Sequence, residues 1–254
     1  MRTLFLAWQA PADRAWFPVG RLDADTEHSI YRFCYTRGAN EARTEGFHPI
    51  ASFPDFAATY QSSELFPMFR NRVLGSQRRD FKSYLDSLAL NTPDPISILA
   101  VSGGERQTDS FEVFPKIEKE ADGSFRCRFF LHGLRHMREA AQDRAMALVE
   151  GEALGVSVEL NNPKYGLAIQ LTSHDYEFIG WTPRYIVADL LKAINKTHDI
   201  TAKVIKVNAV TVPLNRRVLV ELQGILPPDY EPMADDIFLP FSQSPMRSRR
   251  TETA

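Results

Sequence analysis

Three short clusters of cationic, amide and aromatic residues alternate with apolar segments in the second half of the chain. They read Leu131-His-Gly-Leu-Arg-His-Met137, Asn161-Asn-Pro-Lys-Tyr165 and Ile179-Gly-Trp-Thr-Pro-Arg184. Guanidinium and ammonium groups bind phosphates, and flat rings stack on nucleobases. Because turns at strand ends present such side chains on loops, the three clusters predict one polar and aromatic pocket.

The first cluster places Arg135 and His136 just after Gly133, which lets the backbone turn away from the preceding strand. An exposed guanidinium beside an imidazole can pair with a phosphate and stack on a base. The plain alternative is a surface loop with a solvated Arg135.

The second cluster is a turn, because Pro163 restricts Asn162 to an extended or turn conformation. The next two residues, Lys164 and Tyr165, then project from the turn. One is a cation and the other is a flat ring, so the turn offers a phosphate contact and a stacking surface.

In the third cluster, Pro183 begins a helix whose free amide groups, together with Arg184, form a seat for an anion. Trp181 follows Gly180, which permits close approach of another segment. Trp181 is either a pocket residue or an aromatic residue of the core.

No catalytic constellation accompanies these clusters, so we expect a protein that is not an enzyme and has no metal or cofactor. His132 and His136 are four residues apart, but no HExxH motif or neighbouring carboxylate accompanies them. The Ser102-Gly-Gly104 segment lacks the spacing and the Lys of a phosphate-binding loop, and a helix end explains it better.

The composition indicates a folded protein, since 44% of the 254 residues are hydrophobic and 17 are Phe. The net charge is −2, so no overall positive charge points to nucleic acid. Residues 1–124 have a balance of −3, however, and residues 125–226 have a balance of +3. With no metal-like Cys spacing, signal peptide or membrane span evident, we expect a cytoplasmic protein without membrane association.

Hydrophobic spacing and turn signals predict the elements that position the clusters, and the fold class is α+β. In the first half, strands are predicted at 4–8, 16–20, 30–35 and 111–114, and helices at 55–60, 65–73, 78–90 and 96–101. In the second half, strands are predicted at 125–129, 153–160, 167–171, 203–208 and 218–223, and helices at 138–148 and 183–195.

Three parts follow from this pattern. Residues 1–120 are expected to form a small β-sheet with helices, and residues 125–226 a barrel-like domain of about six strands with two helices. The polar composition of residues 227–254 predicts a mostly unstructured tail, in which Phe238, Leu239 and Phe241 are the residues able to dock.

The tract from Leu131 to Arg184 resembles the HIRAN domain, a module of chromatin-remodelling helicases and of standalone bacterial proteins that grips the end of single-stranded DNA. The resemblance implies a nucleic-acid-binding site formed by Arg135, His136, Asn162, Lys164, Tyr165, Trp181 and Arg184.

The family pattern Asn-Pro-Tyr-Asp is changed here, because Lys164 occupies the Tyr position and Tyr165 the Asp position. The carboxylate that would accept a hydrogen bond from a terminal sugar hydroxyl is therefore missing from the motif. This departure concerns selectivity for DNA 3′ ends more than general binding of single strands.

Residues 17–115 resemble the N-terminal subdomain of HipA-type kinases, the toxins of bacterial toxin–antitoxin modules. The similarity lies in Val19-Gly-Arg-Leu22, Tyr31-Arg-Phe-Cys-Tyr35, residues 65–74, and residues 98–104 followed by 111–115. The family's kinase core is absent from the sequence, so the resemblance implies an interaction module that docks onto a separate HipA-like kinase.

Two functions follow from these resemblances. The leading expectation is a non-enzymatic protein that binds single-stranded DNA or DNA 3′ ends. The alternative is a non-catalytic interaction module or an antitoxin-like partner of a HipA-type kinase.

Overall fold

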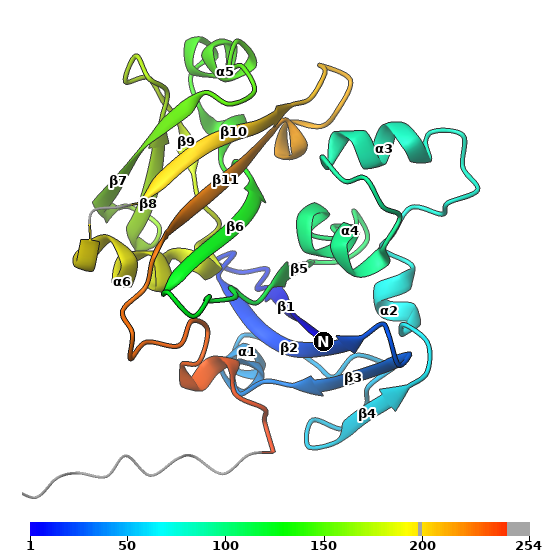
Figure 1. Ribbon diagram of the computed structural model, residues 1–254. Helices are drawn as coiled ribbons and strands as arrows, with labels where there is room; N and C mark the ends of the chain where they lie inside the picture. The colour runs from blue at the N-terminus through cyan, green and yellow to red at the C-terminus, as the bar shows by residue number, and fades with distance from the viewer. Residues whose placement is uncertain (198–199, 243–254) are drawn as a thin grey trace, which may run out of the picture.

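The computed structural model describes residues 1–197 and 200–242, and it is an α+β structure with two antiparallel sheets (Figure 1). The five-stranded sheet has the order β4-β3-β2-β1-β5, and the six-stranded sheet the order β6-β11-β10-β7-β8-β9. The first sheet consists of β1 (Arg2–Gln9), β2 (Trp16–Asp25), β3 (Ile30–Tyr35), β4 (Thr59–Ser62) and β5 (Phe111–Pro115). The second consists of β6 (Ser124–Phe130), β7 (Ala153–Asn162), β8 (Gly166–Thr172), β9 (Phe178–Trp181), β10 (Thr201–Val207) and β11 (Val218–Ile225).

Short helices connect and cover the strands. The α-helices are α1 (Gly38–Thr44), α2 (Pro67–Arg70), α3 (Phe81–Ser87), α4 (Pro95–Ser102), α5 (Glu139–Met146) and α6 (Val187–Thr197). The 3₁₀ turns are η1 (Leu134–His136), η2 (Arg184–Ile186), η3 (Leu214–Arg216) and η4 (Asp236–Phe238). None of the helices within the described ranges combines the length and the hydropathy that a transmembrane span requires.

Both faces of the five-stranded sheet are apolar, because successive apolar side chains of β1 point to opposite faces. Leu4 and Leu6 belong to one buried cluster, which includes residues of α1, α2 and α4. Phe5 and Ala7 point the other way and belong to a second buried cluster with the interior of the six-stranded sheet. The sheet is therefore packed between helices and the second sheet.

The two halves that we predicted correspond to the two sheets, but one buried cluster spans both. Phe5 and Phe114 from the first sheet lie in the same cluster as Phe129 and Val220 from the second. Tyr185, which begins the link into α6, stacks on Phe114 with ring centroids 3.8 Å apart. Apolar burial of this kind contributes about 25 cal/mol per Å², so the shared cluster holds the sheets together.

The predicted helix at residues 55–60 is wrong, because this stretch is a turn followed by β4. The Asp55 carboxylate accepts a hydrogen bond from the backbone N–H of Ala57, which makes a turn instead of a helix cap. Tyr60 then pairs with Phe33 across the β3–β4 ladder. The predicted helices at 65–73 and 78–90 exist only as the shorter α2 and α3.

The six-stranded sheet and the two helices α5 and α6 confirm the strand count of the second half, but the sheet is not a closed barrel. β6 and β9 lie at opposite ends of the strand order. They are joined by one bridge, in which His132 and Trp181 exchange backbone N–H···O hydrogen bonds of 2.9 and 3.0 Å. The ladder does not continue, because Gly133 has φ +80° and turns the chain into η1.

The segment after Pro227, which we expected to be mostly unstructured, packs against the fold through residue 242. Met233 and Phe238 are buried. The Asp189 carboxylate of α6 accepts hydrogen bonds from the Tyr230 hydroxyl and the Met233 N–H. Phe241, which we named as able to dock, stacks on Phe56 with centroids 5.6 Å apart. Residues 243–254 lie outside the described residues.

Candidate functional site

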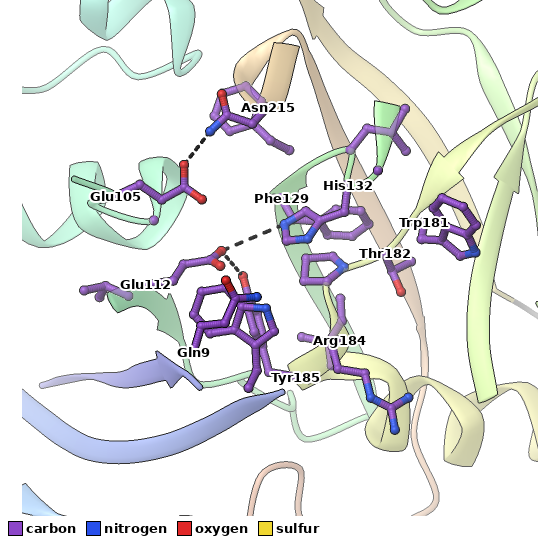
Figure 2. Close-up of a pocket in the computed structure, with 18 of the residues that line it drawn as sticks. Gln9, Glu105, Glu112, Phe129, His132, Trp181, Thr182, Arg184, Tyr185 and Asn215 are labelled. Atoms are coloured by element: carbon purple, nitrogen blue, oxygen red, sulfur yellow. Dashed lines mark hydrogen bonds and ion pairs between the residues drawn. The ribbon is translucent and has the colours of Figure 1, made fainter. Parts of the chain in front are cut away.

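A large cleft of about 1720 Å³ lies between the two sheets, with β5 on one side and β6 on the other (Figure 2). Both are edge strands, since each pairs with a single neighbour in the strand order. The loops that follow β6, β7 and β9 contribute to the lining, together with the segment between α4 and β5, residues of β1 and the turn after it, and η3. The seven residues predicted from the sequence all line this cleft, and they are Arg135, His136, Asn162, Lys164, Tyr165, Trp181 and Arg184.

The lining is rich in cations, whereas the whole chain has a net charge of −2. It contains five carboxylate residues, Glu105, Asp109, Glu112, Glu118 and Glu159. Its ten cationic residues are Arg2, Arg14, Arg106, Lys116, Arg126, Arg128, Arg135, Lys164, Arg184 and Arg216. Cations thus outnumber carboxylates two to one in the lining, and an excess of positive charge in a cleft attracts anionic ligands.

Several of these cations form ion pairs with carboxylates outside the lining. Arg128 pairs with Glu221 at 2.8 Å, and Arg2 pairs with Asp94 at 3.3 Å. In residues 1–197 and 200–242, by contrast, no carboxylate lies within ion-pair distance of the predicted site residues Arg135, Lys164 and Arg184. These cations are thus available to an anionic ligand.

The turn between β7 and β8 is built around Asn162. Its Oδ1 accepts hydrogen bonds of 3.1 Å from the backbone N–H groups of both Lys164 and Tyr165, and this fixes the turn. Its Nδ2 donates to Glu159 Oε2 at 3.0 Å. Asn162 therefore positions the residues that follow it, and its own side chain is occupied within the protein.

Tyr165 lies beside two of the cations that line the cleft, Lys164 and Arg184. The Lys164 Nζ is 4.9 Å from the centre of the Tyr165 ring, and the Arg184 Cζ is 5.1 Å from it. Arg184 also donates a 2.6 Å hydrogen bond to the carbonyl oxygen of Leu167 in β8. The predicted convergence of these three residues from two loops is therefore observed, and it joins a flat ring to two positive charges.

Trp181 is half-buried and held on several sides. Its Nε1 donates a 2.8 Å hydrogen bond to Glu159 Oε2, and Phe178 packs edge-on against the ring at 4.7 Å. A Cβ atom at Gly133 would lie 2.3 Å from the ring atom Cε3. Trp181 thus locks the turn after β6 onto β9, and we assign it a positioning role.

Glu159 is a site residue that the sequence analysis missed. It accepts hydrogen bonds from Asn162 and Trp181, and it lines the cleft. Burial acts to raise the pKa of Glu159, but these hydrogen bonds outweigh it and the pKa is lowered. An ionised carboxylate therefore lies next to the Asn162 turn.

Arg135 and His136 form an exposed pair at η1. The Arg135 Nε donates a 3.0 Å hydrogen bond to His136 Nε2, so the two side chains lie together at the cleft edge. The Gly133 turn directs them there, as the sequence predicted. The pair leaves both terminal nitrogens of Arg135 for a ligand.

A second group of polar residues lies deeper in the cleft and was not predicted as part of the site. The Tyr185 hydroxyl donates a 2.9 Å hydrogen bond to Glu112 Oε1, and His132 Nε2 lies 3.9 Å from the same oxygen (Figure 2). Glu112 is on β5, His132 follows β6, and Tyr185 is in η2. The group forms only where the two sheets meet.

The surroundings of Glu112 and His132 shift the pKa values of both side chains. Burial raises the pKa of Glu112 to about 8, and the nearby Glu105 carboxylate adds to this effect. The Tyr185 hydrogen bond and Arg216 reduce it. Burial also lowers the pKa of His132, although 36% of its side chain is exposed. At neutral pH, Glu112 is therefore mostly protonated and His132 is uncharged.

One sequence signal for Glu112 was present. In Phe111-Glu-Val-Phe114, Glu112 shares a face with Phe114, so the alternation placed a carboxylate on an apolar face.

Within the described residues, no group of three or more His, Cys, Asp or Glu side chains is arranged to hold a metal ion. Comparison of the chain with protein-family models, with curated proteins and with solved structures gives no match.

Proposed function

We propose that the chain binds single-stranded nucleic acid, in particular single-stranded DNA, in the cleft between β5 and β6. The excess of cations in the lining, in a chain whose net charge is −2, is the observation that supports this most directly. The Tyr165 ring beside Lys164 and Arg184 adds a stacking surface next to the phosphate contacts.

The residues have separate roles in this proposal. Arg135, Lys164 and Arg184 neutralise phosphates, since none of them is paired with a carboxylate of the described chain. Tyr165 and His136 stack on bases, and each stacked base contributes ~1–3 kcal/mol. Asn162 and Trp181, whose polar atoms are occupied within the protein, hold the two loops in place.

We also propose that the cleft recognises the 3′ end of the bound strand. The Glu159 carboxylate lies beside the Asn162 turn, where its Oε2 accepts hydrogen bonds from Asn162 and Trp181 and the carboxylate is also hydrogen-bonded by Gln170. A terminal 3′-hydroxyl can donate to this carboxylate, whereas a 3′-phosphate is repelled by it. We therefore expect a 3′-hydroxyl strand to bind more tightly than the same strand with a 3′-phosphate.

Fluorescence anisotropy with a labelled 12-mer tests the proposal, with the single strand compared against its duplex over a range of salt concentrations. Three phosphate contacts on a single strand predict a slope of roughly −2 in log affinity against log salt. The single strand should bind at least about tenfold more tightly than the duplex, and the triple variant Arg135→Ala, Lys164→Ala, Arg184→Ala should lose most of the slope.

Lys82→Ala is a matched control, because Lys82 is an exposed cation on α3 that does not line the cleft. It should leave both the affinity and the slope unchanged. Equal binding of duplex and single strand that is also unchanged in Arg135→Ala contradicts the proposal. For strand ends, Glu159→Gln should remove the preference for the 3′-hydroxyl over the 3′-phosphate.

A further inference from the structure

One edge of β6 is open to the cleft. β6 pairs with β11 on one side, and its other side is the margin of the sheet that faces β5 and α4 (Figure 1). Every residue from Arg126 to Leu131 lines the cleft. An unpaired strand edge offers a row of backbone N–H and C=O groups with which another strand can pair.

The regular alternation of an antiparallel ladder shows which backbone groups of β6 face the cleft. The Leu131 N–H donates a 2.8 Å hydrogen bond to the Val218 carbonyl oxygen, so every second residue of β6, counted back from Leu131, bonds to β11. The residues between them, Arg128 and Phe130, direct their N–H and C=O groups away from β11. These four groups have no hydrogen-bond partner in residues 1–197 and 200–242.

The chain itself closes this edge at both ends. At one end His132 exchanges backbone hydrogen bonds with Trp181. The next pair of that ladder would join Phe130 to Pro183, which has no N–H to donate. At the other end Lys119 forms an antiparallel bridge with Phe125. Both closures are antiparallel, and the open stretch between them matches one short strand.

The facing edge of β5 does not offer the same row of groups. Its Val113 N–H donates a 2.7 Å hydrogen bond to the carbonyl oxygen of Gly103, and Pro115 has no N–H. A strand that enters the cleft therefore finds its backbone partners on β6.

The open groups include donors and acceptors in equal number, which favours a peptide backbone as the ligand. Each residue of a polypeptide, except Pro, supplies one N–H donor and one C=O acceptor. The phosphates of a nucleic acid supply acceptors, so they would leave the carbonyl oxygens of Arg128 and Phe130 without a partner.

The side chains beside the open edge favour an acidic peptide. Arg126 and Arg128 lie on the same face of β6, with side chains 66% and 39% exposed. The buried carboxylate of Glu221 lies 3.9 Å from Arg126, 2.8 Å from Arg128 and 3.1 Å from Lys203. One carboxylate thus serves three cations, and this face of the sheet keeps an excess of positive charge.

We propose that the open edge of β6 binds an extended acidic peptide of a partner protein, which adds to the six-stranded sheet as an antiparallel strand. Residues directly opposite each other share a face, so the peptide residues opposite Arg126 and Arg128 carry carboxylates. The peptide residues between them lie on the face where β6 has the buried side chains of Phe125, Cys127 and Phe129, and they are apolar.

This inference goes beyond the proposed function and does not rest on it. The peptide pairs with the wall of the cleft that β6 forms. Arg135, Lys164 and Arg184, which are assigned to phosphates, belong to the loops that follow β6, β7 and β9. The two activities can therefore be tested separately.

Fluorescence anisotropy with a labelled peptide of alternating Val and Glu, about seven residues long, tests the inference on the full-length chain. This peptide should bind at least about tenfold more tightly than one of alternating Val and Lys. N-methylation of its Glu amides should abolish binding, because these residues face β6 in an antiparallel pair. N-methylation of its Val amides, which face away from β6, should leave the affinity largely unchanged.

Two variants separate the backbone contact from the charge. Arg128→Ala keeps the N–H and should reduce the preference for the acidic peptide severalfold. Arg128→Pro also removes the N–H, at an edge position where Pro breaks no ladder hydrogen bond, and should abolish binding of both peptides. Thermal unfolding verifies that the variants fold, and Lys82→Ala, outside the cleft, should bind as the wild type does.

The outcomes distinguish this inference from the proposed function. No binding of the acidic peptide, or binding that survives methylation of its Glu amides, overturns the inference and leaves the proposed function. Equal affinity of Arg128→Pro and Arg128→Ala for the acidic peptide also overturns it. If neither peptide binds, and a dT 12-mer loses affinity in Arg128→Pro but not in Arg128→Ala, the edge serves nucleic acid instead. A chain that binds the acidic peptide but no single strand keeps this inference and removes the proposed function.

Discussion

The Tyr185 hydroxyl of η2 donates a 2.9 Å hydrogen bond to Glu112 of β5, so it bridges the contact between the two halves of the molecule. Glu112 lies on β5 of the five-stranded sheet, whereas Tyr185 follows β9 of the six-stranded sheet. The Tyr185 ring also stacks on Phe114, two residues from Glu112. One side chain thus links the halves through an apolar and a polar contact.

Removal of this hydroxyl should weaken the link without disturbing the ring. Tyr185→Phe keeps the stacking on Phe114 but loses the hydrogen bond to Glu112, so the free energy of unfolding should fall by about 1 kcal/mol. Urea denaturation measures this change. Tyr176→Phe is the control, because Tyr176 is 89% exposed, and it should change the free energy by less than about 0.5 kcal/mol.

A methyl group at Gly133 should disrupt the loop that carries Arg135. Gly133 and Gly151 both have positive φ, so Ala strains the backbone by about 1–2 kcal/mol at either position. At Gly133 the new Cβ also collides with the Trp181 ring, whereas nothing lies within 4 Å at Gly151. Urea denaturation should therefore show Gly133→Ala to be about 1–3 kcal/mol less stable than Gly151→Ala. Equal losses contradict the packing of Trp181 on this turn.

The stability of the protein should fall between pH 6.5 and pH 8. The pKa of Glu112 is raised from 4.5 to about 8 on folding, so in this range the folded chain binds a proton that the unfolded chain has released. The resulting loss should be about 1–2 kcal/mol in urea denaturation, and Glu112→Gln should remove it. His132, whose pKa is lowered, has the opposite effect, which is mostly complete at its ordinary value of 6.5 and offsets the fall only slightly above it.

Carboxylates with a lowered pKa do not confuse this measurement. Asp189, whose pKa burial raises, is present in both the wild type and Glu112→Gln, so the difference between the two curves isolates Glu112. The pKa values of Glu152, Asp175 and Glu221 are lowered, so the stability that these carboxylates contribute is fully present above pH 4.5 and constant through the range. A wild-type curve that is flat from pH 6.5 to 8, or a fall of the same size in the wild type and in Glu112→Gln, contradicts the assignment.

The packing of residues 227–242 should depend on Asp189. Its Oδ1 accepts hydrogen bonds of 2.8 Å from the Tyr230 hydroxyl and 2.9 Å from the Met233 N–H. Asp189→Ala should therefore cost about 2 kcal/mol and speed chymotrypsin cleavage at Tyr230 severalfold. Asp189→Asn keeps the acceptor oxygen and should restore most of the protection. Cleavage that is unchanged in Asp189→Ala means that this segment is held by its apolar contacts alone.

Much of the fold was predictable where the signal was local. The helix predicted at 96–101 follows Asp94 and Pro95, residue types that favour a helix start, and the Asp94 carboxylate accepts hydrogen bonds from the N–H groups of Ile96 and Ser97 at the start of α4. Gly103 predicted its end, and it is in the left-handed region with φ +71°. At Asp55 the same kind of residue forms a turn, because pairing of β4 with β3 decides the conformation there.

In the candidate site, too, residues with a local sequence signal were predicted and residues that depend on long-range contacts were not. The loop residues were found because Arg135, Lys164 and Arg184 each lie in a short cluster of polar residues. Glu112 was missed because its contacts in the cleft come from His132 and Tyr185, which are distant in the sequence. Glu159 was missed because it lies inside a strand, and its contact with Trp181 bridges 22 residues. A single strand pattern shows that Glu112 shares a face with Phe114, but it does not show which sheet will cover that face.

The cluster in which Phe5 and Phe114 pack with Phe129 has a thermodynamic consequence. If either sheet unfolded alone, the apolar residues that the other sheet contributes to this cluster would be exposed to water. The chain should unfold in one all-or-none transition, and a compound that occupies the cleft should raise the melting temperature of the whole molecule. At a ligand concentration of 100 Kd the gain is about 2.7 kcal/mol. Calorimetry of the intact chain against a panel of oligonucleotides thus reports occupancy of the cleft without a label.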